Sequence, residues 1–369
     1  MKSTELPLIH LIAAARPNFM KIAPLYHVLS KADWCRVELV HTGQHYDANM
    51  SDAFFRDLDL PTPDYHLGVG GHSNIEQTAQ VMLAYDRVCE ETKPSWIVVV
   101  GDVNSTLACA LVGVQRGIRT AHLEAGLRSG DRHMPEEINR LLTDAICDLL
   151  WTPSPDADEN LRLENTDPAR VERVGNIMID TYEMMRDRIQ KTLTYCRFGL
   201  NEGKYAVVTL HRPSNVDDKS RLTTIVDALE TMTSFLPIVF PLHPRTKKML
   251  ERFMLFERIS GITDFHFIEP LGYVEFMGLA SRARLILTDS GGIQEEATYI
   301  GIPCLTLREN TERPITLTEG TNRLVDIFTL TEAVDDVLST EPARKTPPAL
   351  WDGNTAERVA NSLRRNCAP

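Results

Sequence analysis

The sequence predicts an α/β fold of two doubly wound domains that face each other across a central cleft. Its 369 residues suit two domains at roughly 150 residues each. With 43% hydrophobic and 24% charged residues, the composition is that of a globular protein. Short apolar runs also alternate with helical stretches along both halves, which is typical of parallel sheets covered by helices.

The first half of the chain contains one strand–helix series. Residues 96–100 are apolar at every position, as in a central strand covered on both faces. A helix is expected from Asn104 to about Gly117, with Asn104-Ser105-Thr106 supplying the N-cap chemistry. The other elements expected here are strands at residues 8–12, 37–41, 120–123 and 149–152 and a helix over about residues 18–32.

A second series begins near Gly175. Strands are expected at residues 206–210, 238–242, 265–268, 285–288 and 304–307, with helices between them that include about residues 220–234 and 293–300. Residues 341–348 are Pro-rich and form a linker, and residues 355–365 form a closing helix. We therefore expect an N-terminal domain over 1–174, a second domain over 175–350, and a C-terminal helix in 351–369 that packs back on the first domain.

Charge and cysteine usage exclude several classes of protein. The formal net charge is −12 and no basic run occurs, so nucleic acid and anionic membranes are poor partners. No apolar stretch approaches the roughly 18 residues of a membrane span. The apolar residues 6–15 are expected to form a buried strand and not a secretory signal, because Pro7 and His10 interrupt them. Seven cysteines occur singly, which indicates reduced thiols in a cytoplasmic protein and no cysteine metal site.

The segment from Thr288 to Glu296 is the most informative for binding, because it lies where a strand ends and a helix begins. Gly291 and Gly292 allow close approach of a ligand to the backbone, and the N–H groups of a first helical turn favour an anion. A phosphate or diphosphate is therefore expected, with Glu296 placed to accept hydrogen bonds from ribose hydroxyls. The alternative is a capped helix with two turn glycines.

Carboxylates follow consecutive strands of the first domain. Asp102 comes directly after the apolar strand, and Glu124 ends the next one. Glu136 stands in the first turn of an expected helix, on the same face as Arg140. Taken singly, Asp102 is equally a helix cap and Glu136 a surface ion-pair partner of Arg140.

Basic residues concentrate at strand ends in this acidic chain, which indicates an anionic ligand. They are Arg16 and Lys21 after the first strand, His211-Arg212 and His243-Pro244-Arg245 in the second domain, and Arg308 and Arg313 near the last strong strand. Gly68-Val69-Gly70-Gly71 is not a dinucleotide fingerprint, and Walker A, G-x-S-x-G and H-E-x-x-H motifs are absent from the sequence.

Taken together, these segments resemble the non-hydrolysing UDP-N-acetylglucosamine 2-epimerases, a family with the twin-Rossmann architecture of GT-B glycosyltransferases. The similarity runs from Ala14 to Gly353. The blocks that carry it are Arg16-Pro17-x-x-x-Lys21, Thr42-Gly43-Gln44-His45, Gly101-Asp102, His122-Leu123-Glu124-Ala125-Gly126-Leu127-Arg128, Pro135-Glu136-Glu137-x-Asn139-Arg140, His211-Arg212, Asp289-Ser290-Gly291-Gly292-Ile293-Gln294-Glu295-Glu296 and Thr311-Glu312-Arg313-Pro314.

The resemblance implies a role for each matching residue. UDP would be bound by Arg16, Ser290, Gly291, Gly292, Glu296 and Arg313, with Leu271 and Phe276 near the uracil. His211 would lie by the diphosphate and take part in catalysis. Asp102, Glu124 and Glu136 would be the acid/base carboxylates, supported by Lys21 and Arg140. The family interconverts UDP-N-acetylglucosamine and UDP-N-acetylmannosamine without a metal or a nicotinamide cofactor, and its members are usually dimers.

The chain departs from the family pattern at two places. The usual Gly-Thr before Arg-Pro is Ala14-Ala15 here. Some bacterial members bind a second UDP-N-acetylglucosamine as an activator near the Gln-His motif. The matching residues here are Gln44, His45 and His243, whereas Asp47 and Pro213 stand where polar or basic partners are expected.

Other activities remain as alternatives to the resemblance. One is the same 2-epimerisation of a UDP-2,3-diacetamido-2,3-dideoxy-glucuronic acid, since A-R-P starts also occur there. Hydrolytic release of N-acetylmannosamine is a second. A GT-B glycosyltransferase and a non-enzymatic nucleotide-sugar sensor are more distant, because binding alone does not require several carboxylates.

Overall fold

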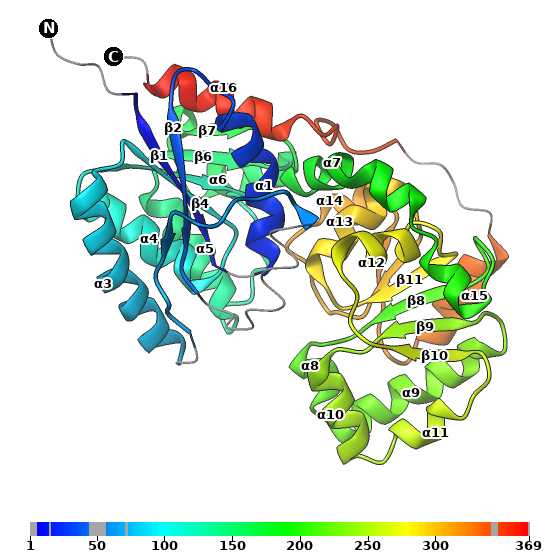
Figure 1. Ribbon diagram of the computed structural model, residues 1–369. Helices are drawn as coiled ribbons and strands as arrows, with labels where there is room; N and C mark the ends of the chain where they lie inside the picture. Colours follow the sequence, from blue (N-terminus) through cyan, green and yellow to red (C-terminus); the bar gives the residue numbers. More distant parts are fainter. Residues whose placement is uncertain (1–5, 15, 44–56, 71–72, 341–345, 368–369) are drawn as a thin grey trace, which may run out of the picture. The chain divides into compact units, whose positions relative to one another are not determined.

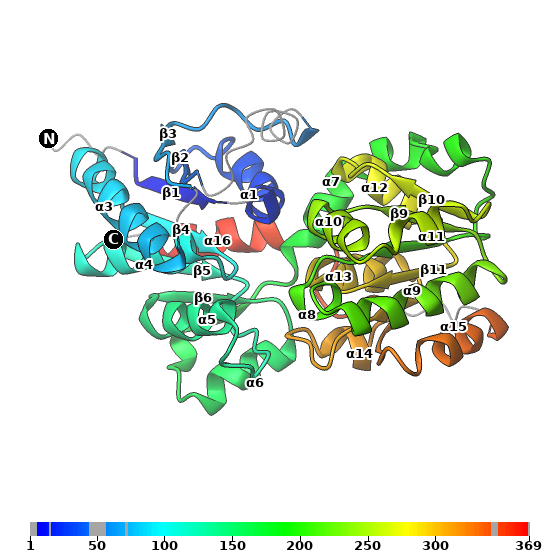
Figure 2. The same cartoon turned by 90° about the horizontal axis from the view of Figure 1, so that it is seen from below.

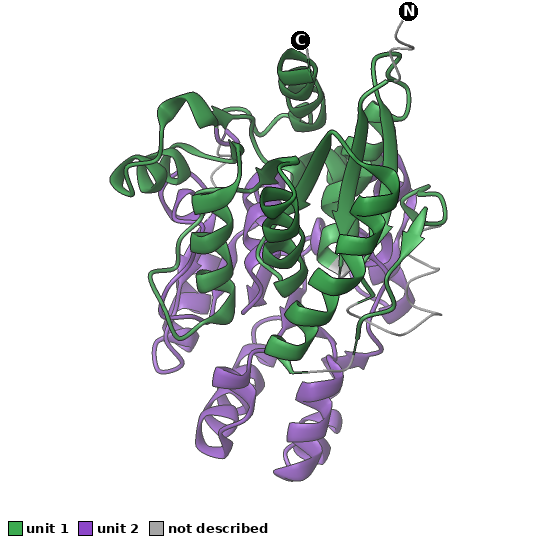
Figure 3. Cartoon of the chain, turned by 90° about the vertical axis from the view of Figure 1, so that its left-hand side faces the viewer, with its two compact units in different colours: residues 1–184, 349–369 green, residues 185–348 purple. Residues whose placement is uncertain are grey.

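The computed structural model describes residues 6–14, 16–43, 57–70, 73–340 and 346–367. Contacts between Cα atoms divide the chain into two compact units (Figure 3): unit 1 is Met1–Met184 with Ala349–Pro369, and unit 2 is Met185–Pro348. The division falls inside helix α7 (Ile177–Lys191), whereas the boundary expected from the sequence precedes it. A single helix thus carries the chain out of unit 1.

Unit 1 is built on a parallel sheet in which the strand order reverses next to the first strand. The seven strands lie in the order β3-β2-β1-β4-β5-β6-β7 (Figure 1), which is a doubly wound sheet. Every residue of β4 is buried, in agreement with its unbroken apolar run. The strands are β1 (Leu8–Ala13), β2 (Arg36–His41), β3 (Tyr65–His66), β4 (Trp96–Val100), β5 (Arg119–Leu123), β6 (Leu149–Thr152) and β7 (Val171–Arg173).

Helices cover both faces of this sheet. Figure 2 shows α3 and α4 side by side, and α1 packs with the C-terminal helix α16. Successive residues of a strand point to opposite faces. Leu150 accordingly joins the cluster under α3 and α4, while the Trp151 Nε1 donates to Ser362 Oγ of α16 at 3.0 Å. The helices are α1 (Arg16–Leu29), α3 (Asn74–Thr92), α4 (Asn104–Gln115), α5 (Pro135–Ile146), α6 (Pro155–Leu163) and α16 (Thr355–Cys367).

Unit 2 repeats the plan with a six-stranded parallel sheet in the order β10-β9-β8-β11-β12-β13. The strands are β8 (Ala206–Thr209), β9 (Ile238–Pro241), β10 (Phe265–Ile268), β11 (Leu285–Thr288), β12 (Cys304–Thr306) and β13 (Asn322–Leu324). The main core lies under α9 (Lys219–Thr233), α10 (Pro244–Arg252), α11 (Phe256–Ser260) and α15 (Leu330–Ser339). The opposite face packs against α12 (Tyr273–Ala280) and α13 (Gly291–Ile300). Two short helices, α8 (Pro213–Val216) and α14 (Ile315–Thr318), follow strand ends.

The predicted α/β fold of two doubly wound sheets is confirmed, and one local prediction is wrong. The N-cap of α4 is Val103, which makes no side-chain cap bond. Asn104 instead donates to Gln77 Oε1 of α3 at 2.8 Å, and Ser105 Oγ lies 2.8 Å from Thr42 Oγ1. These side chains are buried, so the need to satisfy them inside the core outweighs capping.

Among the helices of the described ranges, none has the length and apolar character needed to cross a bilayer. All seven cysteines carry free thiols, and five of them are buried.

Helix α16 allows a direct test of how much the last segment contributes to unit 1. Leu363 is completely buried in α16, whereas the next residue, Arg364, is exposed. Leu363→Ala is expected to lower the free energy of unfolding of unit 1 by about 2–5 kcal/mol, because a buried cavity replaces packed methyl groups. Urea unfolding followed by circular dichroism measures this, with Arg364→Ala as the control. Equal midpoints for the two variants would show that α16 is not part of the core.

Candidate active site

Two carboxylates of unit 1 stand side by side because their strands are neighbours. Strands β4 and β5 pair in parallel with Val100 opposite Leu123. Asp102 and Glu124 follow these residues at the same edge of the sheet, beside the point where the strand order reverses. Gly101, at φ +68°, and Glu124, at φ +71°, both adopt the left-handed conformation that turns the chain there. A left-handed glutamate is unusual, so tertiary contacts must hold it.

Glu124 is buried and paired with a lysine. Its Oε2 forms an ion pair with Lys21 Nζ from α1, and the two side chains are 3% and 10% exposed. The other carboxylate oxygen, Oε1, is buried without a hydrogen-bond partner in the described part of the chain. A Cβ at position 101 would lie 3.2 Å from Lys21 Nζ and crowd the ammonium group, and the φ of +68° also favours glycine there. The pair thus presents one unsatisfied carboxylate oxygen, a feature suited to accepting a proton.

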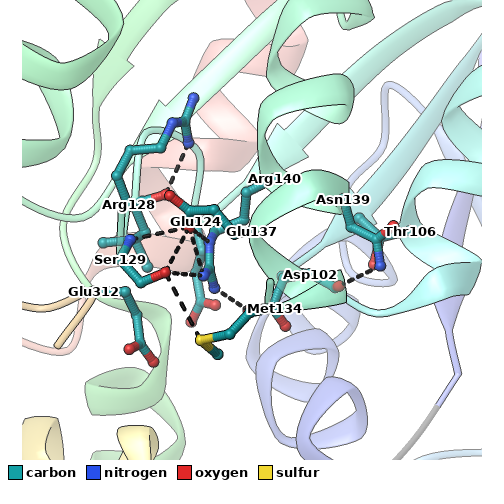
Figure 4. A network of polar contacts seen from close by, with 12 residues as sticks. Asp102, Thr106, Glu124, Arg128, Ser129, Met134, Glu137, Asn139, Arg140 and Glu312 are labelled. Atoms are coloured by element: carbon teal, nitrogen blue, oxygen red, sulfur yellow. Dashed lines mark hydrogen bonds and ion pairs between the residues drawn. The ribbon is translucent and has the colours of Figure 1, made fainter. Parts of the chain in front are cut away.

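Asp102 is held by Arg140, as Figure 4 shows. The Arg140 guanidinium pairs with Asp102 Oδ2 and, through Nη2, with Glu137 Oε2 at 2.8 Å. Burial raises the pKa of Glu137, but hydrogen bonds from Ser129 and Arg140 outweigh it and lower the pKa below its usual value. Asp102 remains 30% exposed, so this carboxylate is reachable from solvent.

The structure therefore corrects the alternative interpretations of these residues. Asp102 does not cap α4, because Val103 is its N-cap. Arg140 pairs with Glu137, three residues before it, and not with Glu136, whose side chain is exposed. The sequence offered two adjacent glutamates, and only burial distinguishes the one that pairs with Arg140.

In unit 2, a buried aspartate organises the turn after β8. Asp289 follows β11, is 0% exposed, and accepts backbone N–H groups from His211 at 3.0 Å and Arg212 at 2.9 Å. Its Oδ1 also lies 2.7 Å from Nδ1 of His211, whose side chain is 41% exposed. Burial raises the pKa of Asp289, but the bonds from His211 and Arg212 lower it below its ordinary 3.8. The ionised Asp289 thus fixes the hydrogen of His211 on Nδ1 and leaves Nε2 for a ligand.

His243 lies beside His211, with ring centroids 5.7 Å apart. Its Nδ1 accepts the Arg245 N–H at 3.2 Å, which caps α10. Burial, followed by the charge of His211, lowers the pKa of His243, so this ring is neutral at pH 7. Gln44 and His45, the other residues of the expected second site, lie outside the described residues.

The Ser290 turn opens helix α13. Ser290 is the N-cap but makes no side-chain cap bond, so the alternative of a conventionally capped helix does not hold. A Cβ at Gly291 would lie 2.6 Å from Glu312 Oε1 and 2.8 Å from Arg313 Nη1, so a larger residue would displace these two side chains. Beyond its own helix, no described atom lies within 4 Å of a Cβ built at Gly292. The first turn of α13 is therefore accessible at Gly292, as an anion site requires.

Arg313 belongs to a buried group of alternating charges. It pairs with Glu295 at 2.8 Å and with Glu312, and Glu312 pairs with Arg308 at 2.8 Å. Burial raises the pKa of Glu312, but Arg313 and Arg308 outweigh it and hold the pKa far below its usual range. Two carboxylates balance two guanidinium groups, so the group as a whole is neutral beside the Ser290 turn.

The remaining residues predicted to bind UDP lie on three different elements of the fold or beside them. Glu296 is buried in α13, at 4% exposure. Leu271 and Phe276 are half-buried and pack beside the cluster formed by Tyr205 and Val207. Arg16 is the first residue of α1, and its side chain is outside the description. Sequence inspection missed Glu137 and Asp289 as organising carboxylates, although both stand inside the blocks quoted above.

Comparisons with known proteins agree on one family. A family model described as UDP-N-acetylglucosamine 2-epimerase matches residues 27–364. The chain is 40% identical over 364 residues to the UDP-N-acetylglucosamine 2-epimerase of Methanocaldococcus jannaschii, covering 96% of this chain and 98% of the relative. It is also 40% identical over 317 residues to the UDP-2,3-diacetamido-2,3-dideoxy-D-glucuronate 2-epimerase of Pseudomonas aeruginosa, covering 85% and 87%.

Solved structures of the same family have the same fold. The Methanocaldococcus jannaschii UDP-GlcNAc 2-epimerase in complex with UDP-GlcNAc and UDP superposes with a TM-score of 0.89 at 39% identity, over 97% of this chain and 99% of that one. The enzyme from Neisseria meningitidis bound to UDP-GlcNAc gives 0.88 at 27% identity, over 97% and 100%.

The ionised state of Asp289 makes a prediction for stability against pH. A carboxyl whose folded-state pKa is depressed stabilises the fold above its unfolded pKa, and the contribution is lost as the pH falls through the folded value. Asp289→Asn is expected to cost about 1.5–3 kcal/mol at pH 7, because hydrogen bonds to a charged acceptor are lost. The difference from wild type should narrow by pH 3, as measured by urea unfolding. The exposed Asp264→Asn is the control, and a gap for Asp289→Asn that stays constant with pH would contradict the assignment.

Proposed function

Because this chain belongs to the UDP-N-acetylglucosamine 2-epimerase family, we propose that it interconverts UDP-N-acetylglucosamine and UDP-N-acetylmannosamine without hydrolysing them. The observation that carries the proposal is the pair of strand-end carboxylates in unit 1, one buried against Lys21 and one held by Arg140. A protein that only binds a nucleotide sugar has no need of charges arranged for proton transfer.

Unit 2 is proposed to bind the UDP group. The first turn of α13 offers backbone N–H groups for the diphosphate, and His211 Nε2 is available beside it. The proposed UDP contacts in unit 2 are Ser290, Gly291, Gly292, Glu296 and Arg313, with Leu271 and Phe276 beside the uracil. Arg16 of unit 1 is a further proposed contact. In this proposal Arg313 contacts UDP while it stays paired with Glu295 and Glu312.

The proposed chemistry begins with departure of UDP. The proton at sugar C2 is not next to a carbonyl, so a base alone does not remove it. When the C1–O bond to UDP breaks, C1 becomes oxocarbenium-like, the C2 proton becomes acidic, and the electron pair of the C2–H bond forms the C1–C2 alkene. Positive charges and hydrogen-bond donors that stabilise the leaving diphosphate lower this barrier, and His211 is proposed to lie beside the diphosphate.

Return of the proton to the other face of C2, followed by addition of UDP to C1, completes the inversion. Acid/base groups are then needed on both faces, which supports roles for Asp102, Glu124 and Glu136. Lys21 pairs with Glu124 and Arg140 pairs with Asp102, so two of these carboxylates are held in place by cationic side chains.

We further propose that the protein acts in the cytoplasm as a homodimer, as the family resemblance implies. Gln44, His45 and His243 are the proposed contacts of a second nucleotide sugar.

Proton nuclear magnetic resonance of UDP-N-acetylglucosamine incubated with the full chain tests the proposed function. The anomeric signal of UDP-N-acetylmannosamine is expected to appear until the two nucleotides reach equilibrium. UDP-2,3-diacetamido-2,3-dideoxy-glucuronic acid forms a second arm. Turnover of this second nucleotide alone, or accumulation of free sugar with UDP, would overturn the proposal.

The role of the α13 turn is tested by Gly292→Ala. The new methyl group meets no described atom outside the helix, and alanine stabilises a helix interior by about 0.5–1 kcal/mol relative to glycine. Stability should therefore be kept or improved, whereas UDP affinity measured by calorimetry should fall about tenfold or more, because the methyl group occupies the diphosphate position. Gly261→Ala, also in open space but at the end of α11, is the matched control. Unchanged UDP affinity in Gly292→Ala would remove this turn from the site.

Asp102→Asn separates chemistry from binding. It is expected to lower kcat by about 10²–10⁴-fold, since an amide does not accept the proton. UDP affinity should stay within about twofold of wild type, because Asp102 is not a proposed UDP contact and all of those contacts except Arg16 lie in unit 2. The exposed Asp33→Asn serves as the control. An equal loss of affinity and turnover would instead indicate a structural role for Asp102.

A further inference from the structure

Behind the two strand-end carboxylates, unit 1 contains a buried ionic group that the catalytic assignment does not use. It consists of His122 from β5, Asp144 from α5 and Arg128 from the segment between them. His122 Nδ1 lies 2.6 Å from Asp144 Oδ1, and its Nε2 lies 2.8 Å from the carbonyl oxygen of Gly101. The side chains of His122 and Asp144 are 0% and 1% exposed, so neither contacts a substrate.

The partners of His122 determine its protonation. A carbonyl oxygen only accepts, so Nε2 carries a hydrogen. Asp144 Oδ2 accepts the Gly126 N–H at 3.0 Å and pairs with Arg128 Nη1 at 2.7 Å, which makes the carboxylate an acceptor. Burial raises the pKa of Asp144, but the charges of His122 and Arg128 lower it below its ordinary value. Nδ1 also faces an acceptor, so both ring nitrogens of His122 are placed to donate hydrogen bonds.

Arg128 extends this group toward the surface. Its guanidinium pairs with Asp144 and also with Glu164, which is 36% exposed. The buried Asp144 carboxylate therefore lies between two basic side chains, His122 and Arg128.

This group clamps the backbone on each side of the candidate acid/base residues. His122 Nε2 holds the carbonyl of Gly101, the residue directly before Asp102. Asp144 holds the ring of His122, two residues before Glu124, and the N–H of Gly126, two residues after it. Three of the residues in these turns, Gly101, Glu124 and Gly126, adopt the left-handed conformation, with φ of +68°, +71° and +80°. Such a conformation persists at a non-glycine residue only when its surroundings fix it.

We propose that His122 and Asp144 are positioning residues: their buried ion pair fixes the two turns that present Asp102 and Glu124 to the sugar. The role rests on the proposed epimerisation, because its consequence is the geometry of proton transfer. A displacement of about 1 Å at a reacting group lowers a rate by roughly 100-fold.

The closest test compares Asp144→Asn with a matched control in the full chain. Asp144→Asn keeps the shape of the side chain and removes its charge. The control is His10→Gln in strand β1. It removes a completely buried ring whose Nδ1 lies 3.0 Å from the Tyr85 hydroxyl oxygen. Asp144→Asn is expected to lower kcat for UDP-N-acetylglucosamine about 100-fold with KM changed by less than about threefold, whereas His10→Gln keeps kcat. Similar kcat values in the two variants, or a loss in Asp144→Asn confined to KM, would overturn the positioning role.

A second measurement does not depend on activity. Nitrogen-15 resonance of histidine-labelled wild-type protein at pH 7, assigned with His122→Gln, is expected to show a proton on both ring nitrogens of His122. The Nδ1 proton should be absent in Asp144→Asn. If the wild type epimerises no substrate, the proposed function fails. Protons on both ring nitrogens of His122 would still support the ion pair in that case. A neutral His122 in the wild type would overturn the pair whatever the activity.

Discussion

Pairing of buried charge is the constraint on which both candidate ligand regions depend. Glu124 with Lys21, Asp144 with His122 and Asp289 with His211 each place a carboxylate at 0–3% exposure beside a nitrogen of a basic side chain. Removing one partner of such a pair leaves an uncompensated charge in the interior, which is strongly destabilising. These pairs therefore fix the orientation of side chains that would be mobile at a surface, and that order is what proton transfer and anion binding require.

Strand topology determines where these pairs lie. In unit 1 the order reverses between β1 and β4, and in unit 2 between β8 and β11. Lys21 follows β1 and Asp102 follows β4, while His211 follows β8 and Asp289 follows β11. Both sheets thus place their ionic groups beyond the carboxyl ends at the reversal, where doubly wound sheets bind ligands. The two units use the position differently: unit 1 presents carboxylates, and unit 2 presents a helix N-terminus with a histidine.

Much of this arrangement was predictable because buried parallel strands are apolar at every position. The run at residues 96–100 matches β4, and the polar residues that follow such runs include Asp102, Glu124 and His211. The side-chain pairings were not predictable from local sequence, because each depends on a partner that only the fold brings close. Asn104 bonds across to α3 instead of capping α4, and Arg140 selects Glu137 over Glu136. Asp144 stands in the last turn of α5, where one aspartate carries no pattern that distinguishes a buried ion-pair partner from a surface residue.

In the proposed mechanism, the carboxylates of unit 1 exchange the hydrogen at sugar C2 while UDP is detached. Incorporation of deuterium tests this most directly. UDP-N-acetylglucosamine is incubated with the protein in heavy water, and the recovered nucleotide sugars are examined by nuclear magnetic resonance. Deuterium at C2 of both sugars, with the C2 proton signal lost, is the predicted result. Formation of UDP-N-acetylmannosamine with the original proton retained at C2 would contradict the account.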